Sequence, residues 1–217
     1  MPLRLGIFLR VVAQAPALRV CECLLADSNE IDHGCNMESQ IRIRQTTRMR
    51  KGRVSIAGAR YFMALCTRNR NPCLLEEAIA GMIFTQLERQ ADEGDIELLC
   101  GVIMPDHFHI VFRLGSRLSL GQVVAKFKSK TKSVTQWQEG YYEHRIRPDE
   151  VEENYAFYVF MNPYVGELCG LKEQWRWWRR WRPVPYDFEA LLGDRGSIPS
   201  EWIKKEKSIR SALSVDS

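Results

Sequence analysis

Two apolar runs joined by a two-residue turn constrain the fold of this 217-residue chain more than any other feature. Residues 96–104 and 107–114 each have the composition of a strand, and only Pro105 and Asp106 separate them. Proline and aspartate favour turns, and two strands with so short a connection pair antiparallel. We therefore expect a β-hairpin, around which the rest of the fold must be arranged.

The order of the remaining periodic segments predicts a split βαβ arrangement. Residues 61–67 form an apolar run typical of a strand, and residues 75–92 show the apolar spacing of a helix. A second helix begins after the hairpin, where Ser119 and Gln122 form a capping box. Residues 141–147 provide a fourth strand. This order predicts an α+β fold with a central antiparallel sheet and helices on one face.

A polar pair, His107 and His109, interrupts the second strand of the hairpin and accounts for two of the four histidines in the chain. Because side chains alternate along a strand, both imidazoles project from one face of the sheet, whereas Phe108 projects from the other. Two imidazoles on one face can hold a metal ion. The spacing is also compatible with two surface or half-buried histidines on an edge strand.

A helix with a tyrosine and an asparagine on one face follows the fourth strand. The pattern predicts that it begins with Asp149 as its cap and ends before Pro163. Tyr158 and Asn162 are four residues apart and therefore share a face of this helix. A phenol that can act as a nucleophile thus lies beside an amide oxygen that can bind a metal. Tyr155 is the competing phenol, and most aromatic residues of such a helix belong to the core.

Three motifs in this order and spacing resemble those of the REP-associated tyrosine transposases of bacteria. The motifs are MPDHFH at residues 104–109, YYEHRIR at residues 141–147 and YVFMNP at residues 158–163. The REP-associated enzymes belong to the single-tyrosine HUH transposases and nucleases, which act on single-stranded DNA. The resemblance covers roughly residues 50–170, and the three motifs together are far more specific than any one of them.

The resemblance implies a ferredoxin-like domain in which the histidine pair lies on a central strand and the tyrosine helix packs over it. It implies that Tyr158 is the nucleophile and that His107, His109 and Asn162 ligate a divalent metal ion. The implied cofactor is Mg²⁺ or Mn²⁺, although imidazole also accepts zinc. The implied activity is that of a single-stranded DNA transposase or endonuclease, which cleaves and rejoins DNA at REP-type hairpins through a 5′-phosphotyrosine intermediate.

The residue types agree with such a reaction. A divalent ion near a phosphodiester neutralises negative charge that would repel an attacking oxyanion. A free phenol has a pKa of about 10 and is a weak nucleophile at neutral pH, so it needs a nearby cation or a base. Glu143 and His144 are candidates for that base, but they can equally bind phosphate or each other.

Basic residues are concentrated locally, although the net charge is only +4. Residues 41–60 are rich in arginine and hold no acidic residue, the second helix carries lysine at every second position, and residues 175–182 interleave tryptophan with arginine. Cationic side chains neutralise phosphates, and aromatic rings stack on bases. The alternatives are a solvated lysine face and tryptophans that seal the core. The expected DNA-binding residues are Arg50, Arg53, Lys126, Lys128, Lys130, Lys132, His144, Arg147, Trp177, Arg179 and Arg180.

These patterns divide the chain into three parts. Residues 1–50 are expected to be a disordered extension that is basic at its end, residues 51–170 the HUH catalytic domain, and residues 171–217 a Trp/Arg-rich segment followed by an irregular tail. The change to family-like sequence after Met37 raises the hypothesis that translation starts there, which mass spectrometry of the N-terminal peptide would test.

Several protein classes do not fit the sequence. Seven cysteines, an odd number without a Cys-x-x-Cys pair, argue against a disulfide framework or a zinc finger. The apolar runs near the N-terminus contain Arg10 and Arg19 and are too short to span a membrane. We expect a cytoplasmic protein that does not bind a membrane, and the REP-associated resemblance favours a monomer over a dimer.

The sequence leaves two other functions open. One is a domesticated protein that binds hairpin DNA without cleaving it, and the other is an RNA-directed module, because ferredoxin-like sheets with exposed aromatic residues also bind RNA. The intact set of His107, His109, Tyr158 and Asn162 favours the cleaving enzyme.

Overall fold

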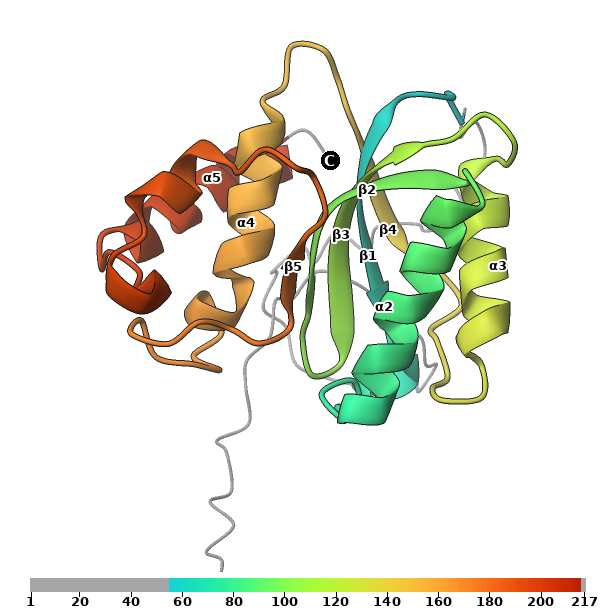
Figure 1. Cartoon of the computed structure of the whole chain (residues 1–217), viewed down its shortest axis with the longest axis horizontal. Helices are drawn as coiled ribbons and strands as arrows, with labels where there is room; N and C mark the ends of the chain where they lie inside the picture. The colour runs from blue at the N-terminus through green and yellow to red at the C-terminus, as the bar shows by residue number, and fades with distance from the viewer. Residues whose placement is uncertain (1–54, 216–217) are drawn as a thin grey trace, which may run out of the picture. The chain divides into compact units, whose positions relative to one another are not determined.

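The structure of the protein is a computed structural model that describes residues 55–215, all within the compact unit Arg42–Ser217 (Figure 1). The expected N-terminal extension, residues 1–50 with Arg50, lies outside the described residues, and so does Arg53. Cys21, Cys23 and Cys35 also lie outside them.

A five-stranded antiparallel sheet forms the centre of the domain, with the strand order β4-β1-β3-β2-β5. The strands are β1 (Arg60–Cys66), β2 (Ile96–Ile103), β3 (His107–Leu114), β4 (Tyr142–Ile146) and β5 (Trp178–Arg180). The strands β2 and β3 form the predicted hairpin, and β3 lies in the middle of the sheet between β1 and β2. Together with the two helices that separate them, the first four strands make the split βαβ unit, which confirms the predicted fold class.

Helices cover both faces of this sheet (Figure 1). The longer helices are α2 (Glu77–Asp92), α3 (Leu120–Thr131), α4 (Glu152–Val165) and α5 (Trp202–Val215), with short helices η1 (Arg68–Arg70), η2 (Asp187–Leu191) and η3 (Asp194–Gly196). On one face α2 and α3 pack together, as expected, whereas α4 covers the opposite face and α5 packs on α4. The prediction of helices on one face alone is therefore wrong for α4.

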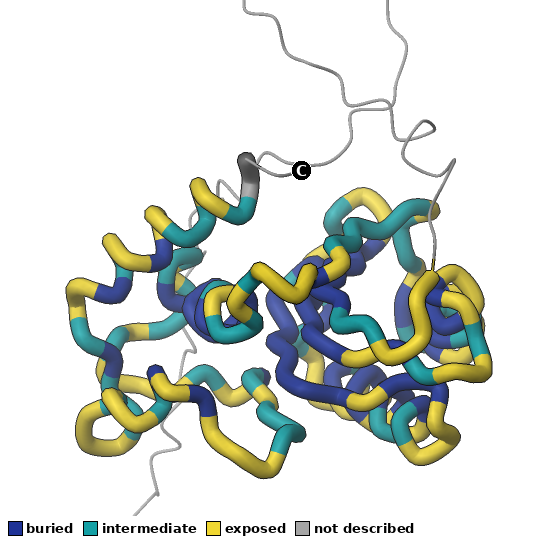
Figure 2. Tube along the Cα trace, turned by 90° about the horizontal axis from the view of Figure 1, so that it is seen from above, coloured by how far each residue is buried: buried dark blue, intermediate teal, exposed yellow. Residues whose placement is uncertain are grey.

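Alternation along β3 explains the two layers. Phe108, Ile110 and Phe112 enter the core beneath α2 and α3, whereas Val111 enters the core beneath α4. Both faces are apolar, so each must be covered. Figure 2 shows that the buried residues run along the strands and α4, whereas the loops are largely exposed.

The boundaries of α4 differ from those predicted. Its N-cap is Val151, which makes no side-chain cap hydrogen bond, and Asp149 does not cap the helix. The helix also continues through Pro163 to Val165, where Gly166 donates a backbone hydrogen bond to the carbonyl of Asn162. Proline only disfavours the helical geometry of the residue before it, and burial of the last turn against the sheet outweighs that preference here.

Residues 171–215 are also more ordered than expected. The strand β5 adds to the edge of the sheet beside β2, and α5 places Trp202 against Phe157 on α4, with 5.1 Å between the ring centroids. The expected irregular tail is therefore wrong: the sheet and its second layer continue well beyond residue 170. The apolar positions of α5 are few and widely spaced among charged residues, which is why the pattern did not indicate a packed helix.

Candidate active site

The histidine pair lies on β3, and both rings are almost completely buried. His107 and His109 are 6% and 7% exposed, and their ring centroids lie 4.8 Å apart on the face that α4 covers. Because β3 is a central strand with partners on both sides, the alternative of surface histidines on an edge strand does not hold. Burial of two polar rings inside a sheet indicates a role beyond packing.

Asp106 fixes the orientation of the first histidine. Its carboxylate lies 2.6 Å from His107 Nδ1, and Arg70 lies 2.9 Å from its other oxygen. Although burial opposes ionisation, the hydrogen bond and charge of His107, together with Arg70, lower the pKa of Asp106. A carboxylate that accepts the Nδ1 proton leaves the Nε2 lone pair of His107 for a metal ion, with the tautomer assigned from this contact.

A strained turn brings Arg70 to this position. Asn69 and Arg70, which follow β1, both have a φ of 55°, in the left-handed region that residues other than glycine rarely adopt. Such strain persists where the surrounding contacts determine the conformation, and it is common near functional sites.

His109 has an unsatisfied buried nitrogen. Its ring stacks on Phe62 at 5.5 Å, and no hydrogen bond from residues 55–215 reaches its buried Nδ1. Burial, the neighbouring His107 and the cations Arg210 and Arg70 hold the pKa of His109 well below its usual value. The ring is therefore neutral at physiological pH, which is the form that ligates metals.

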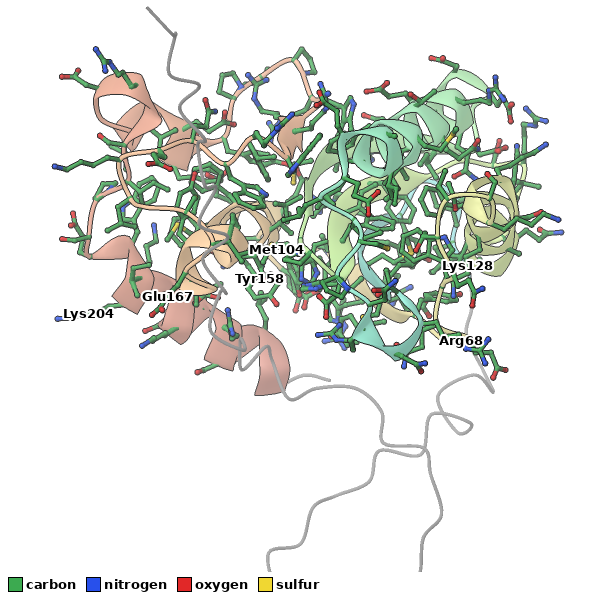
Figure 3. The ribbon with its side chains drawn as sticks, turned by 90° about the horizontal axis from the view of Figure 1, so that it is seen from below. Arg68, Met104, Lys128, Tyr158, Glu167 and Lys204 are labelled. Atoms are coloured by element: carbon green, nitrogen blue, oxygen red, sulfur yellow. The ribbon has the colours of Figure 1, made fainter. Side chains whose placement is uncertain are left out.

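Tyr158 lies beside this histidine. Its ring centroid is 5.5 Å from that of His109 and 5.6 Å from that of Phe62, and its side chain is half-buried. In Figure 3, Tyr158 lies where α4 and α5 face the strands. Asn162, one turn further along α4, donates from Nδ2 to the Tyr158 carbonyl at 2.7 Å. The amide nitrogen is thus held by the helix, which leaves Oδ1 as the atom suited to a metal.

The competing phenol, Tyr155, is engaged elsewhere. It is 3% exposed, its hydroxyl donates to Glu150 at 2.9 Å, and its ring stacks on His144 at 5.3 Å. Burial and the Glu150 carboxylate raise the pKa of Tyr155, which makes its phenolate less accessible. The geometry therefore favours Tyr158 over Tyr155 as a nucleophile.

The two candidates for a base, Glu143 and His144, are not available to Tyr158. His144 Nε2 lies 2.8 and 3.0 Å from the two carboxylate oxygens of Glu150. Glu143 precedes His144 in β4, and because side chains alternate, it lies on the face covered by α2 and α3. Glu143 and His144 therefore point to opposite faces and do not bind each other.

Arg210, on α5, was not expected at the site. Its guanidinium carbon lies 5.5 Å from the centroid of the Tyr158 ring, and its Nε is 2.8 Å from Glu206, whose side chain is fully buried. The sequence did contain a signal, because Lys204, Lys207 and Arg210 are spaced three apart on one side of a helix. It was missed because this segment was predicted to be irregular.

Two of the lysines expected to bind DNA are held by other groups. Lys126 forms ion pairs with Glu93 and Asp95. Lys128 donates to the carbonyl oxygens of Gln138 and Gly140 at 2.5 and 2.8 Å. Both lysines therefore bind neighbouring loops, although they were expected to be exposed and to bind DNA phosphates. Lys130 and Lys132 are exposed at the end of α3.

The remaining expected DNA contacts are divided in the same way. Arg147 and Arg179 are exposed, although Arg179 stacks on Phe84 at 4.6 Å. Arg180 forms an ion pair with Glu189 at 3.1 Å, and the His144 ring is held by Glu150 as described above. Trp177 is 7% exposed in the core beneath α2, so the prediction that it stacks on bases is wrong.

A substitution at Trp177 tests this correction. We expect Trp177→Ala to lower the free energy of unfolding by about 3–5 kcal/mol, because it opens a cavity beside Phe84. Urea denaturation measures this loss. A variant with normal stability and selectively weakened DNA binding would contradict the core assignment.

No group of three or more histidine, cysteine, aspartate or glutamate side chains within residues 55–215 is arranged to hold a metal. The resemblance implies Asn162 as the third ligand beside the histidine pair, and this role stays a prediction. The described cysteines, Cys66, Cys73, Cys100 and Cys169, are free. No helix in the part of the chain that the structure describes is long and apolar enough to span a membrane.

Comparisons with known proteins find similarity to a transposase family and to solved structures. Residues 55–155 match the family model described as "Transposase IS200 like". The match covers just under half of the chain and makes this region similar to the IS200-like transposases.

One solved structure of similar fold is described as "Structure of the REP associates tyrosine transposase bound to a REP hairpin". It has a TM-score of 0.52 and 20% identity, with 68% of this chain and 86% of that chain covered. A putative transposase from Deinococcus radiodurans R1 gives a TM-score of 0.37 and 19% identity over 46% of this chain and 88% of its own, too weak to support an argument. The first similarity shows a shared fold. A comparison with curated proteins finds no significant match.

Proposed function

We propose that this protein is a single-stranded DNA transposase that cleaves and rejoins DNA through a 5′-phosphotyrosine bond on Tyr158. The observation that carries the proposal is the position of the Tyr158 ring, 5.5 Å from that of His109 on the central strand. A phenol beside two buried imidazoles has the groups that this reaction needs, and the match of residues 55–155 to the IS200-like transposase model supports the proposal.

In the proposed reaction, the Tyr158 oxygen attacks the scissile phosphorus. A bond from the phenolic oxygen to phosphorus forms, the bond from phosphorus to the 3′ oxygen breaks, and the phenolic proton is lost to solvent while the 3′ oxygen leaves as a hydroxyl. The link conserves the energy of the broken bond, so a later 3′ hydroxyl can reverse the step and join new ends without a nucleotide cofactor.

A divalent cation, Mg²⁺ or Mn²⁺, fits the residues present. His107 and His109 would hold it through neutral imidazoles and Asn162 through Oδ1, and the unsatisfied Nδ1 of His109 supports a site that is completed by a ligand. When bound, such an ion neutralises phosphate charge and polarises the phosphorus. Zinc is compatible with the two imidazoles but is less suited to an oxygen-rich set of phosphate, water and amide ligands.

Arg210 is proposed to hold the nucleophile in position. A cation over an aromatic ring stabilises the contact by about 0.5–2 kcal/mol. Glu206, one turn earlier on α5, accepts a hydrogen bond from the guanidinium and holds it in place. Asp106 and Arg70 would orient His107 in the same indirect way.

We expect Arg210→Gln to slow cleavage by about tenfold, because a loss of about 1.4 kcal/mol in positioning corresponds to that factor. The double variant Arg210→Gln/Glu206→Gln removes the buried carboxylate that the single variant leaves unpaired, and it should show the same slow rate with a normal melting temperature. Lys204→Gln, an exposed substitution on the same helix, is the control (Figure 3). A double variant that folds and cleaves at the wild-type rate would show that Arg210 plays no part.

The preferred substrate is a DNA hairpin with a single-stranded flank. The similar fold of a REP-associated tyrosine transposase, whose structure is described as bound to a REP hairpin, supports this class. A monomer is also proposed, because one chain brings both Tyr158 and the histidine pair to the site. A cytoplasmic location stays a prediction.

Two differently labelled substrates test the proposed reaction. The purified protein is incubated with Mn²⁺ and hairpin DNA labelled at either the 5′ or the 3′ end, and the products are separated under denaturing conditions. A 5′-phosphotyrosine link predicts that the 3′-labelled part becomes attached to protein, whereas the 5′-labelled part is released with a free 3′ hydroxyl. Binding without any attached label would favour the non-cleaving DNA-binding alternative, and a reaction confined to RNA of the same sequence would favour the RNA-directed one.

A further inference from the structure

An open polar groove lies at the end of the sheet that carries His107. It consists of two adjoining hollows of about 770 and 360 Å³, and Arg68, Lys132, Thr135 and Gln136 line both of them. One wall is the loop after β1 that contains η1, and the other is the segment that follows α3. In Figure 3, Arg68 and Lys128 lie together on this side of the molecule, with Tyr158 nearer its middle. This surface is called the amide groove below.

The amide groove is attached directly to the turn that carries the histidine pair. Thr67 donates its backbone N–H to the Asp106 carbonyl at 2.8 Å, and Leu74 donates to the Pro105 carbonyl at 2.9 Å. The same loop supplies Arg70 to Asp106, and Cys66 at the end of β1 pairs with His107. The loop that forms one wall of the amide groove is therefore bonded to the turn that precedes His107.

The charge of the groove is available to a ligand. Within residues 55–215, neither Arg68 nor Lys132 forms an ion pair, and both side chains are exposed. This distinguishes them from Lys126 on the preceding helix, which is neutralised by two carboxylates. Glu76 and Glu139 are the acidic residues among the lining side chains.

The groove also has a set of amide side chains. Asn69, Asn71 and Gln136 line it, all three are exposed, and their side chains form no hydrogen bond with the described part of the chain. An amide offers both donors and an acceptor, the combination that reads the edges of unpaired bases. Contacts to phosphates position a nucleic acid without distinguishing its sequence.

We propose that the amide groove binds the unpaired nucleotides next to the scissile phosphate, with Arg68 and Lys132 on their phosphates and Asn69, Asn71 and Gln136 on their bases. This inference rests on the proposed function for the position of the scissile phosphate. It assigns the choice of flanking sequence to a surface separate from Tyr158 and the histidine pair.

Two double variants separate the two roles. Arg68→Gln/Lys132→Gln removes the proposed phosphate contacts, and Asn71→Ala/Gln136→Ala removes two of the proposed base contacts. Asn69 is left unchanged because its left-handed φ of 55° would strain a substitution. Lys204→Gln, an exposed lysine on α5, is the control for loss of a positive charge. All variants change exposed side chains, and melting curves verify that they fold.

Equilibrium binding is measured without divalent metal, so that cleavage does not interfere. The probes are a blunt DNA hairpin and the same hairpin with a short oligo-dT, oligo-dA or oligo-dC extension on either side. Arg68→Gln/Lys132→Gln should weaken binding of the best extended hairpin by about tenfold or more, and should reduce the salt slope by about 1.4, since each single-strand phosphate contributes about 0.7. The same double variant should bind the blunt hairpin with wild-type affinity. Lys204→Gln should bind every probe with wild-type affinity.

Asn71→Ala/Gln136→Ala should reduce the ratio between the strongest and the weakest affinity for the three extensions by about tenfold. The salt slope should not change. Wild-type affinity of both double variants for every extended hairpin would overturn the proposal. So would an equal loss on blunt and extended hairpins, or a gain in affinity from an RNA extension alone. If the wild type forms no adduct while the double variants bind the extended hairpins more weakly, the proposed cleavage fails and the groove assignment stands. If the wild type forms the adduct and the double variants bind every extended hairpin normally, only the groove assignment is overturned.

Discussion

A Tyr158→Phe variant is expected to form no covalent adduct with hairpin DNA while it binds the same DNA as tightly as the wild type. The substitution removes only the phenolic oxygen and keeps the ring against Phe62 and His109, so the site should remain packed. Removal of a nucleophile lowers the rate of covalent catalysis by more than about a thousandfold. Denaturing gels of 3′-labelled DNA measure the adduct, and a gel-shift assay measures the binding.

Tyr155→Phe is the matched control on the same helix. It removes the hydroxyl that donates to Glu150, which should cost about 1 kcal/mol of stability and leave the adduct intact. An adduct that survives Tyr158→Phe and disappears in Tyr155→Phe would show that the nucleophile is the other phenol.

Loss of either histidine of the pair should be almost as severe. His109→Ala and His107→Ala are expected to abolish cleavage at every Mn²⁺ concentration, because neither leaves enough protein ligands for a divalent ion, and EDTA should abolish cleavage by the wild type. Cleavage rate against Mn²⁺ concentration is the measurement, with DNA affinity recorded in parallel. Wild-type cleavage by these variants in EDTA would contradict a metal-dependent site.

Asp106→Asn provides a graded test of the same site. The carboxylate accepts a hydrogen bond from His107 and does not itself belong to the proposed ligand set. Loss of such an orienting partner typically costs about 10–100-fold in metal affinity or activity. The Mn²⁺ requirement should therefore rise, and high Mn²⁺ should restore part of the rate, whereas His109→Ala should not be rescued.

The central sheet was predictable because its strands and helices carry strong local signals. The hairpin formed by β2 and β3 has long apolar runs and a short turn, and Ser119 caps α3 through the predicted box. The same rules were less informative for α4 and α5. Packing against the sheet extends α4 past Pro163, and α5 is stabilised by contacts that its largely polar sequence does not indicate.

The candidate site was predictable in part. Strand alternation placed His107 and His109 on one face, and helical spacing placed Tyr158 and Asn162 together, but only the fold brings the two pairs to the same place. The orienting role of Asp106 lay inside the recognised motif, yet the contribution of Arg70 depends on the strained turn after β1.

The charge pattern of the sequence predicted the DNA-binding residues poorly. Lysines at alternating positions of α3 look alike in the sequence, but Lys126 is neutralised by Glu93 and Asp95 in the turn that follows α2. Trp177 and Trp178 are adjacent and belong to opposite faces of the sheet, so one of them had to enter the core beneath α2. Such outcomes depend on tertiary neighbours that no local pattern contains.

The most direct test of the central claim is mass spectrometry of the peptides released by protease from the protein–DNA adduct after nuclease digestion. The account predicts a nucleotide linked through its 5′ phosphate to Tyr158, in wild-type protein treated with hairpin DNA and Mn²⁺. A nucleotide on Tyr155 or on any other residue, or complete cleavage of the DNA with no modified peptide, would contradict it.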